Sequence, residues 1–232
     1  MIKISNADQA RIAEAVARAE TTTSGEIYCV LAPEVSTDGE TPLIWAAAIA
    51  LLLPVLALLA GLRPAMLTAL FGGWTIGHAG AVDGAILSAL ITYSGLQAAV
   101  FVVAALVVSI PPIRRALTPR SLKVAQVRRA ALDLFLAKDL HRTRDRTGVL
   151  IFAALAEHRV EVIADEGIYA AAPHAVWDEV VADVVAGMKR GKVADGFVAA
   201  VTRTGAILAQ HMPPRAGDTN ELPDGLTVVP KG

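Results

Sequence analysis

The sequence predicts an α/β fold, a small mixed-sheet α/β sandwich that is interrupted by a transmembrane helical hairpin. Two stretches, Leu43–Leu62 and Ala85–Ile110, are 20 and 26 residues long and contain no Asp, Glu, Lys or Arg. A helix of about 20 apolar residues spans the roughly 30 Å hydrocarbon core of a bilayer. Patterns typical of helices and strands occur on both sides of these stretches, which indicates one α/β domain in two parts.

We therefore divide the chain into four segments. Residues 1–40 and 114–211 form the two parts of the soluble α/β domain. Residues 41–113 form the transmembrane hairpin, with spans at about 43–62 and 88–110, and residues 212–232 form a flexible tail. Residues 65–82 are also uncharged and leave a third span open as the alternative. We interpret them as an interfacial or re-entrant loop, because a third span would separate the two halves of the domain.

The first part of the domain contains one helix and one strand. Ser5 and Asp8 have the spacing of a capping box, which predicts a helix that continues to about Glu20. The hydroxyl-rich and glycine-containing segment Thr21–Gly25 favours a turn. The apolar segment Glu26–Leu31 then predicts the first strand.

The second part begins with an amphipathic helix and continues with two strands. Apolar side chains at helical spacing predict the helix between Val124 and Leu140. Gly148–Ala154 is a continuous apolar run, typical of a strand that is buried on both faces, and Arg159–Ala164 alternates like a strand with one solvated face. The link between these strands has four residues, so we expect them to pair antiparallel. The first strand is joined to Gly148–Ala154 through a helix, which favours parallel pairing.

Two helices and a tail complete the chain. We expect helices at about Pro173–Lys189 and Asp195–His211, with Asp195 as the N-cap of the second. Trp177 is interpreted as a core aromatic residue near the start of the first of these helices. The segment Pro213–Gly232 is rich in Pro, Gly and Asp and shows no core pattern, so it is predicted to be the tail.

Basic residues gather next to the second predicted span. Residues 114–146 contain 10 Lys/Arg against 3 Asp/Glu, whereas residues 1–42 contain 3 against 7. Positive charge beside a span indicates the cytoplasmic side and contact with anionic headgroups. We therefore expect a multi-pass inner-membrane protein whose soluble domain faces the cytoplasm. Its expected partners are the lipid bilayer, its anionic headgroups and other membrane proteins, and we expect no nucleic acid.

The strongest candidate for a site consists of three carboxylates. Asp165 and Glu166 follow a predicted strand directly, and Asp145 precedes the strand that pairs antiparallel with it. Antiparallel pairing places the start of one strand beside the end of the other, so Asp145 is expected to approach Asp165. Carboxylate oxygens are the ligands that Ca²⁺ and Mg²⁺ prefer, which predicts a metal site at Asp145, Asp165 and Glu166. The alternative is a solvated turn in which Asp165 caps the following segment. No catalytic residue is predicted, and Cys29, the single cysteine, is expected to be a buried and inert thiol.

Several motifs of the soluble segments together indicate a known family. They are Thr23–Ile27, Arg146–Ile151, Val160–Ile168, Trp177 and Gly196-Phe197. On these motifs the chain resembles the TPM domain family, sometimes labelled a phosphatase domain. The resemblance covers about residues 1–32 and 121–211, and within the family the chain is similar to bacterial membrane proteins. Thr147-Gly148 replaces the Asn-Gly turn that is usual in the family.

The resemblance implies an α/β sandwich with an acidic, cation-binding patch at strand ends. It also implies three kinds of role: photosystem repair, auxiliary service for a membrane receptor, and phosphatase activity. We therefore expect a membrane-anchored accessory domain that supports the assembly or maintenance of membrane protein complexes, without a clear catalytic site. The alternative is a metal-assisted phosphatase, because no His, Cys or Ser nucleophile is placed with a partner base and only metal-bound water remains.

Overall fold

The computed structural model describes residues 4–35, 40–61, 81–143, 146–173, 175–215 and 222–229. The chain divides into two compact units. The first unit is formed by residues 1–37 and 120–232, and the second by residues 38–119. Two segments that are far apart in the sequence therefore fold together as the first unit, which is a mixed α/β fold as predicted.

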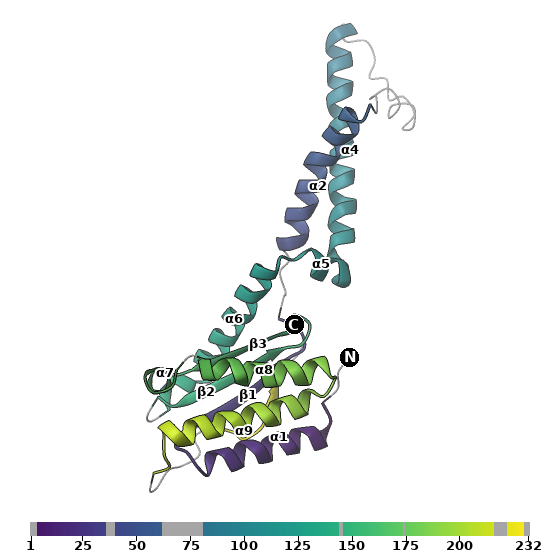
Figure 1. The fold of residues 1–232 in the computed structure, drawn as a ribbon. Helices are drawn as coiled ribbons and strands as arrows, with labels where there is room; N and C mark the ends of the chain where they lie inside the picture. Colours follow the sequence, from purple (N-terminus) through teal and green to yellow (C-terminus); the bar gives the residue numbers. More distant parts are fainter. Residues whose placement is uncertain are drawn as a thin grey trace. The chain divides into compact units, whose positions relative to one another are not determined.

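A four-stranded mixed sheet forms the centre of the first unit, in the order β3-β2-β1-β4 (Figure 1). Strand β1 (Glu26–Ala32) pairs parallel with β2 (Gly148–Ala154), and β2 pairs antiparallel with β3 (Arg159–Ala164). Both pairings agree with the sequence-based prediction, because the link between β2 and β3 is a short turn and the path from β1 to β2 passes through helices. Strand β4 (Leu226–Val228) pairs parallel with the other edge of β1.

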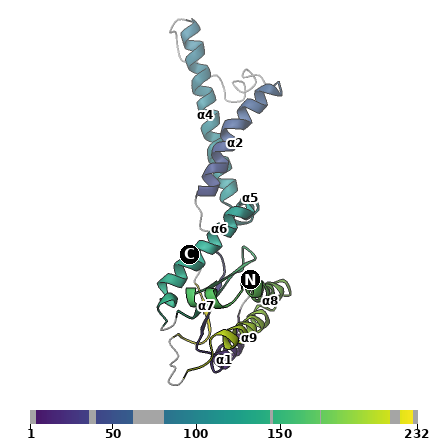
Figure 2. The same cartoon turned by 60° about the vertical axis from the view of Figure 1, so that its left-hand side comes forward.

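Helices cover both faces of this sheet, as Figures 1 and 2 show. Helices α1 (Asn6–Glu20), α8 (Ala175–Lys189) and α9 (Val193–His211) pack on one face. Helix α6 (Arg120–Ala137) packs on the other face. The two short helical segments of the unit are η1 (Leu140–Arg142) and α7 (Glu166–Ala171).

Every residue of β1 and β2 is buried, which explains why both sequences are largely apolar, with Glu26 at the start of β1 as the charged exception. Successive side chains of a strand point to opposite faces. Ile27, Cys29 and Leu31 accordingly belong to the core under α1, α8 and α9, whereas Tyr28 and Val30 belong to the core under α6. Trp177 is buried in the first of these cores, as predicted from the sequence.

The first helix begins as the sequence indicates, but the last one does not. Ser5 caps α1, and its side chain and that of Asp8 form the expected capping box. Asp195 was predicted to cap the last helix, and this is wrong: the N-cap of α9 is Lys192, and Asp195 lies in the first turn. Gly196 serves helix packing instead of helix initiation, because a Cβ atom there would lie 3.0 Å from the Cα atom of Gly187 on α8.

Part of the predicted tail belongs to the sheet. Residues 226–228 form β4, and Leu226 packs against the core beneath α1, α8 and α9. A three-residue strand has too few positions to show a periodic pattern, which is why the sequence did not reveal it. Its partner is the edge of β1 that β2 leaves open.

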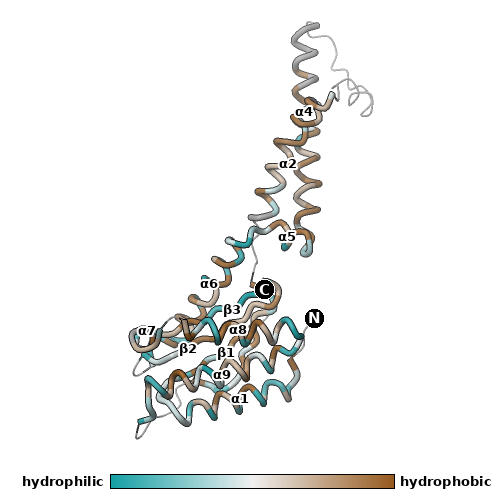
Figure 3. The backbone as a smooth tube through the Cα atoms, viewed as in Figure 1, coloured by the Kyte–Doolittle hydropathy of each residue, from teal (hydrophilic) through white to brown (hydrophobic). Residues whose placement is uncertain are grey.

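The second unit contains α2 (Glu40–Leu59), α4 (Ala81–Ser109) and α5 (Pro111–Leu117). Its hydropathy is shown in Figure 3. Within the described residues, one helix segment, Leu90–Ser109, is long and apolar enough to cross a membrane, and the apolar part of α2, Pro42–Ala57, is shorter. Most of the predicted interfacial loop at 65–82 lies outside the described residues, and its last two residues begin α4.

Helices α2 and α4 pack against each other through small residues. Ala46 and Ala50 of α2 are buried, as are Ala104 and Val108 of α4. The large apolar side chains of both helices are exposed, among them Leu51, Leu52, Leu56, Val103, Leu106 and Val107.

Candidate functional site

Asp165 lies at the junction between β3 and α7 and is 8% exposed. It is the N-cap of α7, and its Oδ1 atom accepts a hydrogen bond of 2.6 Å from the backbone N–H of Glu166. Its own backbone N–H donates to the carbonyl oxygen of Gly148 at the start of β2. The Oδ2 atom is buried and has no hydrogen-bond partner within the described part of the chain. The capping role that the sequence left open is therefore present, and it uses only one of the two carboxylate oxygens.

Two polar loops lie beside Asp165 where β1 and β2 begin. The Thr147 hydroxyl donates to the carbonyl oxygen of Ser24 at 3.0 Å, and the Thr147 N–H donates to the Thr143 hydroxyl oxygen at 3.0 Å. The Glu26 N–H in turn donates to the carbonyl oxygen of Thr147. The segments Thr23–Ile27 and Arg146–Ile151, which carry the resemblance noted above, are thus bonded to each other.

Gly148 is required at the start of β2 for steric reasons. A Cβ atom at this position would lie 2.4 Å from the carbonyl oxygen of Leu140, a distance that side chains do not tolerate. The preceding residue, Thr147, is buried and supplies the hydrogen bonds to the neighbouring loops. Gly148 therefore allows η1 to approach β2 closely, and Thr147 connects the start of β2 to the start of β1.

Glu166 points to a different partner from Asp165. Its Oε2 atom forms a 2.9 Å ion pair with the guanidinium of Arg146, and both side chains are exposed. Exposed ion pairs contribute about 0–1 kcal/mol, so this contact constrains Glu166 only weakly. Asp145, the third predicted ligand, lies outside the described residues.

The predicted metal site is therefore described only in part. Asp165 and Glu166 are adjacent, and the register pairs Val149 at the start of β2 with Ala164 at the end of β3. Among the described residues, no group of three His, Cys, Asp or Glu side chains has the geometry of a metal site. Carboxylate oxygens are donors that suit a hard cation such as Ca²⁺ or Mg²⁺, and Asp165 Oδ2 has no other partner among the described residues.

A second group of carboxylates, which the sequence did not reveal, lies at the edge of β1 that pairs with β4. The Oε1 atom of Glu20, at the end of α1, accepts a 2.9 Å hydrogen bond from the N–H of Ile27. Burial, followed by the nearby charges of Glu26 and Asp224 and a hydrogen bond with Asp224, raises the pKa of Glu20 to about 8. Glu26 is itself buried, and Asp224 lies shortly before β4. Asp224 comes near Glu20 because β4 pairs with β1, and no periodic pattern in the sequence predicts β4.

Cys29 does not belong to either group of carboxylates. The thiol is fully buried in the centre of β1, and this burial raises its pKa well above the usual range. A thiolate is the nucleophilic form of cysteine, so Cys29 is an inert core residue as the sequence predicted.

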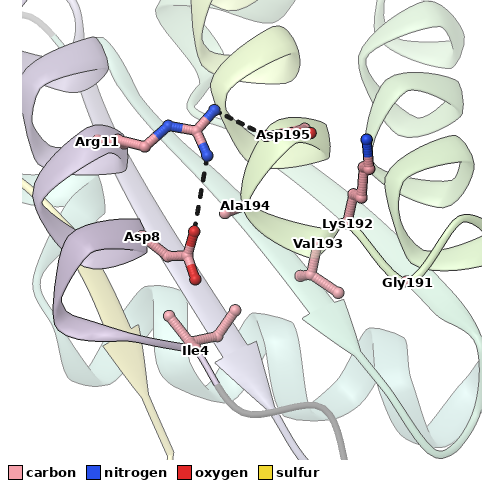
Figure 4. A pocket seen from close by; sticks show the side chains of 8 residues that line it. All are labelled: Ile4, Asp8, Arg11, Gly191, Lys192, Val193, Ala194 and Asp195. Atoms are coloured by element: carbon pink, nitrogen blue, oxygen red, sulfur yellow. Dashed lines mark hydrogen bonds and ion pairs between the residues drawn. The ribbon is translucent and has the colours of Figure 1, made fainter.

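A shallow pocket of about 230 Å³ lies where α1 and α9 begin (Figure 4). Arg11 of α1 reaches Asp195 of α9 at 2.7 Å and Asp8 of its own helix at 3.6 Å. Figure 4 shows Arg11 bonded to both carboxylates, with Lys192 on the far side of the pocket. Arg11 pairs with both Asp8 and Asp195, and the second of these ion pairs links α1 to α9. We therefore interpret these charges as structural and do not choose this pocket as the candidate site.

Comparisons with known proteins agree with this fold. The family profile of the TPM domain matches residues 114–207. This segment of the chain is therefore similar to the TPM domain. The match includes α6, β2, β3, α7 and α8, and therefore both Asp165 and Glu166. Residues 1–32, which also carry the sequence resemblance, lie outside the matched segment but fold into the same unit.

A solved structure has a fold similar to that of this chain. The NMR structure of BA42 protein from the psychrophilic bacterium Bizionia argentinensis superposes with a TM-score of 0.56 at 17% sequence identity. The superposition covers 97% of this chain and 95% of that one. At this identity the likeness shows the fold alone. A search of the curated proteins finds no match.

The Glu20 carboxyl is expected to make the stability of the TPM domain decrease between about pH 4.5 and pH 8. Its pKa is raised in the folded chain, so the folded state keeps a proton that the unfolded state releases in this range. The variant Glu20→Gln cannot ionise and keeps an oxygen acceptor for Ile27. We expect it to match the wild type near pH 4.5 and to be more stable by on the order of 1–2 kcal/mol near pH 8.5, after allowance for solvent screening.

Urea unfolding of the full chain in mild detergent, at a series of pH values, would measure this effect. The matched control is Glu14→Gln, which changes an exposed glutamate of the same helix. A pH dependence in Glu20→Gln equal to that of the wild type would contradict the assignment.

Proposed function

We propose that the chain is a membrane-anchored TPM domain that supports the assembly or maintenance of membrane protein complexes. In this proposal α2 and α4 anchor the chain in the inner membrane, and the TPM domain faces the cytoplasm. The observation that carries the proposal is the distribution of side chains on the two anchoring helices.

Helices α2 and α4 have the packing expected of helices in lipid. Their contact is made by small side chains such as Ala46, Ala50 and Ala104, while large apolar side chains such as Leu52 and Leu106 are exposed. In water the opposite arrangement is favoured, because burial of a leucine side chain is worth about 1.5–3 kcal/mol. In a bilayer, small residues let helix backbones approach closely, and large apolar residues are solvated by lipid tails.

The charge distribution supports the cytoplasmic orientation. Arg114 and Arg115 lie on α5, directly after α4, and Arg120 and Lys123 follow at the start of α6. Cytoplasmic flanks of spanning helices carry an excess of Lys and Arg. With two spans, the segment before α2 returns to the same side, which is compatible with β1 and β2 pairing in one sheet.

An accessory role fits the chemistry of the described residues better than catalysis by a side-chain nucleophile does. The single cysteine is buried in the core. The two described carboxylates of the candidate site are engaged in capping and in an ion pair, respectively. An accessory domain needs a fixed position in the membrane and a recognisable surface, and the hairpin and the folded domain would supply these.

Reporter fusions should place both flanks of the hairpin in one compartment. We expect a tag inserted before Ile44 and a tag inserted after Ile113 to give the cytoplasmic signal in bacterial cells. The reason is that both segments lead into the same folded unit. Signals from different compartments would contradict a two-span hairpin, and a chain that alkaline carbonate extracts from membranes would contradict the anchor.

The accessory role predicts stable association with other membrane proteins. Purification of the full chain in a mild detergent such as digitonin should yield at least one membrane protein in constant stoichiometry. The variant Arg203→Gln removes the ion pairs to Asp183 and Glu179 on the surface of α8 and α9. It tests whether capture of the partner depends on that helix face. Repeated purification without any stoichiometric partner would argue against this role.

The alternative function is a metal-assisted phosphatase. The observation that favours it is the buried Asp165 Oδ2 atom, which has no hydrogen-bond partner in the part of the chain that the structure describes. Asp165, Glu166 and Asp145 would supply oxygen ligands to Ca²⁺ or Mg²⁺. Such a cation lowers the pKa of a bound water and thereby supplies a nucleophile at neutral pH. Arg146, paired with Glu166, would be available beside the site to contact the negative charge of a phosphate.

Calorimetric titration of the purified chain with Ca²⁺ and with Mg²⁺ would test this alternative. We expect Asp165→Asn to weaken metal binding at least tenfold and to abolish metal-dependent hydrolysis of a phosphomonoester, because the variant keeps the capping oxygen but loses the charge. The control Asp133→Asn removes an exposed carboxylate of α6 and should change neither property. Equal binding by Asp165→Asn, or no turnover by the wild type, would exclude the phosphatase.

A further inference from the structure

A second pocket, of about 270 Å³, lies in the first unit and is lined by Arg120, Lys123, Glu157 and Arg159. Arg120 and Lys123 come from the first turn of α6. Glu157 belongs to the turn between β2 and β3, and Arg159 is the first residue of β3. Three cationic side chains from two separate segments of the chain thus converge on one hollow.

The positive charges of this pocket exceed its negative charge. Glu157 is the single carboxylate among the lining residues, and its Oε1 atom accepts a 3.2 Å hydrogen bond from the N–H of Val35. Arg120 and Arg159 are exposed, and neither forms an ion pair within 4.0 Å in the described ranges. Burial raises the pKa of Glu161 on the same strand, and the charge of Arg159 acts against this rise. Helix α6 has no acidic residue in its first turn, where backbone N–H groups add partial positive charge. The pocket therefore favours an anion.

The pocket lies where the chain leaves the first unit for α2 and where it returns from α5. The outgoing segment is bonded to the turn between β2 and β3: the Leu155 N–H donates to the carbonyl oxygen of Ala32, and the Ala156 N–H donates to that of Pro33. The returning segment enters the unit at Arg120, which is itself a lining residue. Both connections to the anchoring hairpin thus border the basic pocket.

We propose that Arg120, Lys123 and Arg159 bind the phosphate group of an anionic phospholipid headgroup at this pocket. The inference rests on the membrane anchor of the proposed function, because insertion of α2 and α4 brings the connections that border the pocket to the headgroup region. Arginine binds phosphate oxygens through paired N–H groups, and lysine adds a compact charge. Basic side chains beside a membrane contribute about 1 kcal/mol each to attraction by anionic lipids.

A free phosphate ion offers the same chemistry, and the position of the pocket separates the two sources. Glu157 lowers the attraction of the pocket for every phosphate, and it can accept a hydrogen bond from a headgroup hydroxyl such as those of phosphatidylglycerol. The connections to the hairpin border the pocket, which favours the phosphodiester of a lipid over a free ion.

Native mass spectrometry of the full chain in a neutral detergent would test this inference. Phosphatidylglycerol, phosphatidylcholine and inorganic phosphate are added in separate titrations. We expect phosphatidylglycerol to bind at least tenfold more tightly than phosphatidylcholine, and phosphate to compete weakly. The double variant Arg120→Gln/Arg159→Gln should lose this preference, whereas the control Lys189→Gln/Arg190→Gln, with the same charge change on exposed residues of another helix end, should keep it.

Three results would overturn the inference. These are an unchanged lipid preference in Arg120→Gln/Arg159→Gln, an equal loss in the control, and phosphate binding as tight as that of phosphatidylglycerol. The single variant Arg159→Gln leaves α6 unchanged and must also weaken the lipid preference. It keeps the inference testable if the double variant does not fold. Failure of the anchor is distinguishable, because topology is measured in cells whereas this binding is measured in detergent.

Discussion

The parallel pairing of β1 with β2 is the contact on which the rest of the structure depends. It runs from Glu26 opposite Gly148 to Ala32 opposite Ala154, and it joins segments that lie on either side of the whole hairpin. Because every side chain of both strands is buried, this pair creates the two cores, one under α6 and one under α1, α8 and α9. The cost of closing a loop rises by only about 0.6 kcal/mol for each doubling of its length, so a long insertion between the strands is tolerated.

The two ends of this strand pair have different chemical character. Where β1 and β2 begin, buried polar groups gather, with Glu20 on the β4 side and Asp165 on the β3 side. Where the two strands end, the chain leaves for the hairpin and returns, and the basic pocket of Arg120, Lys123 and Arg159 is found. Strands of seven residues separate these ends by roughly 20 Å. The basic and the acidic groups therefore lie at opposite ends of the same strand pair.

The carboxylate of Asp165 bears on which function the fold supports. Its buried Oδ2 atom has no hydrogen-bond partner among the described residues, so it is available to a cation or to a donor group of a partner protein. Similarity to the TPM domain over residues 114–207 indicates the fold around these groups but does not choose between the two uses, because a fold hosts many functions.

The sequence by itself determined the local features of this protein. The Ser5–Asp8 capping box, the buried strand Gly148–Ala154 and its antiparallel partner depend on neighbours within a few residues, so periodicity and capping rules were sufficient. Only the tertiary structure decided what depends on distant contacts. Strand β4 exists because β1 has an open edge, and Asp195 pairs with Arg11 of another helix. The pKa of Glu20 is raised because the fold buries this carboxyl and brings Glu26 and Asp224 near it. Likewise, Arg120 and Arg159 share a pocket because α6 packs against β3, an arrangement that no local pattern encodes.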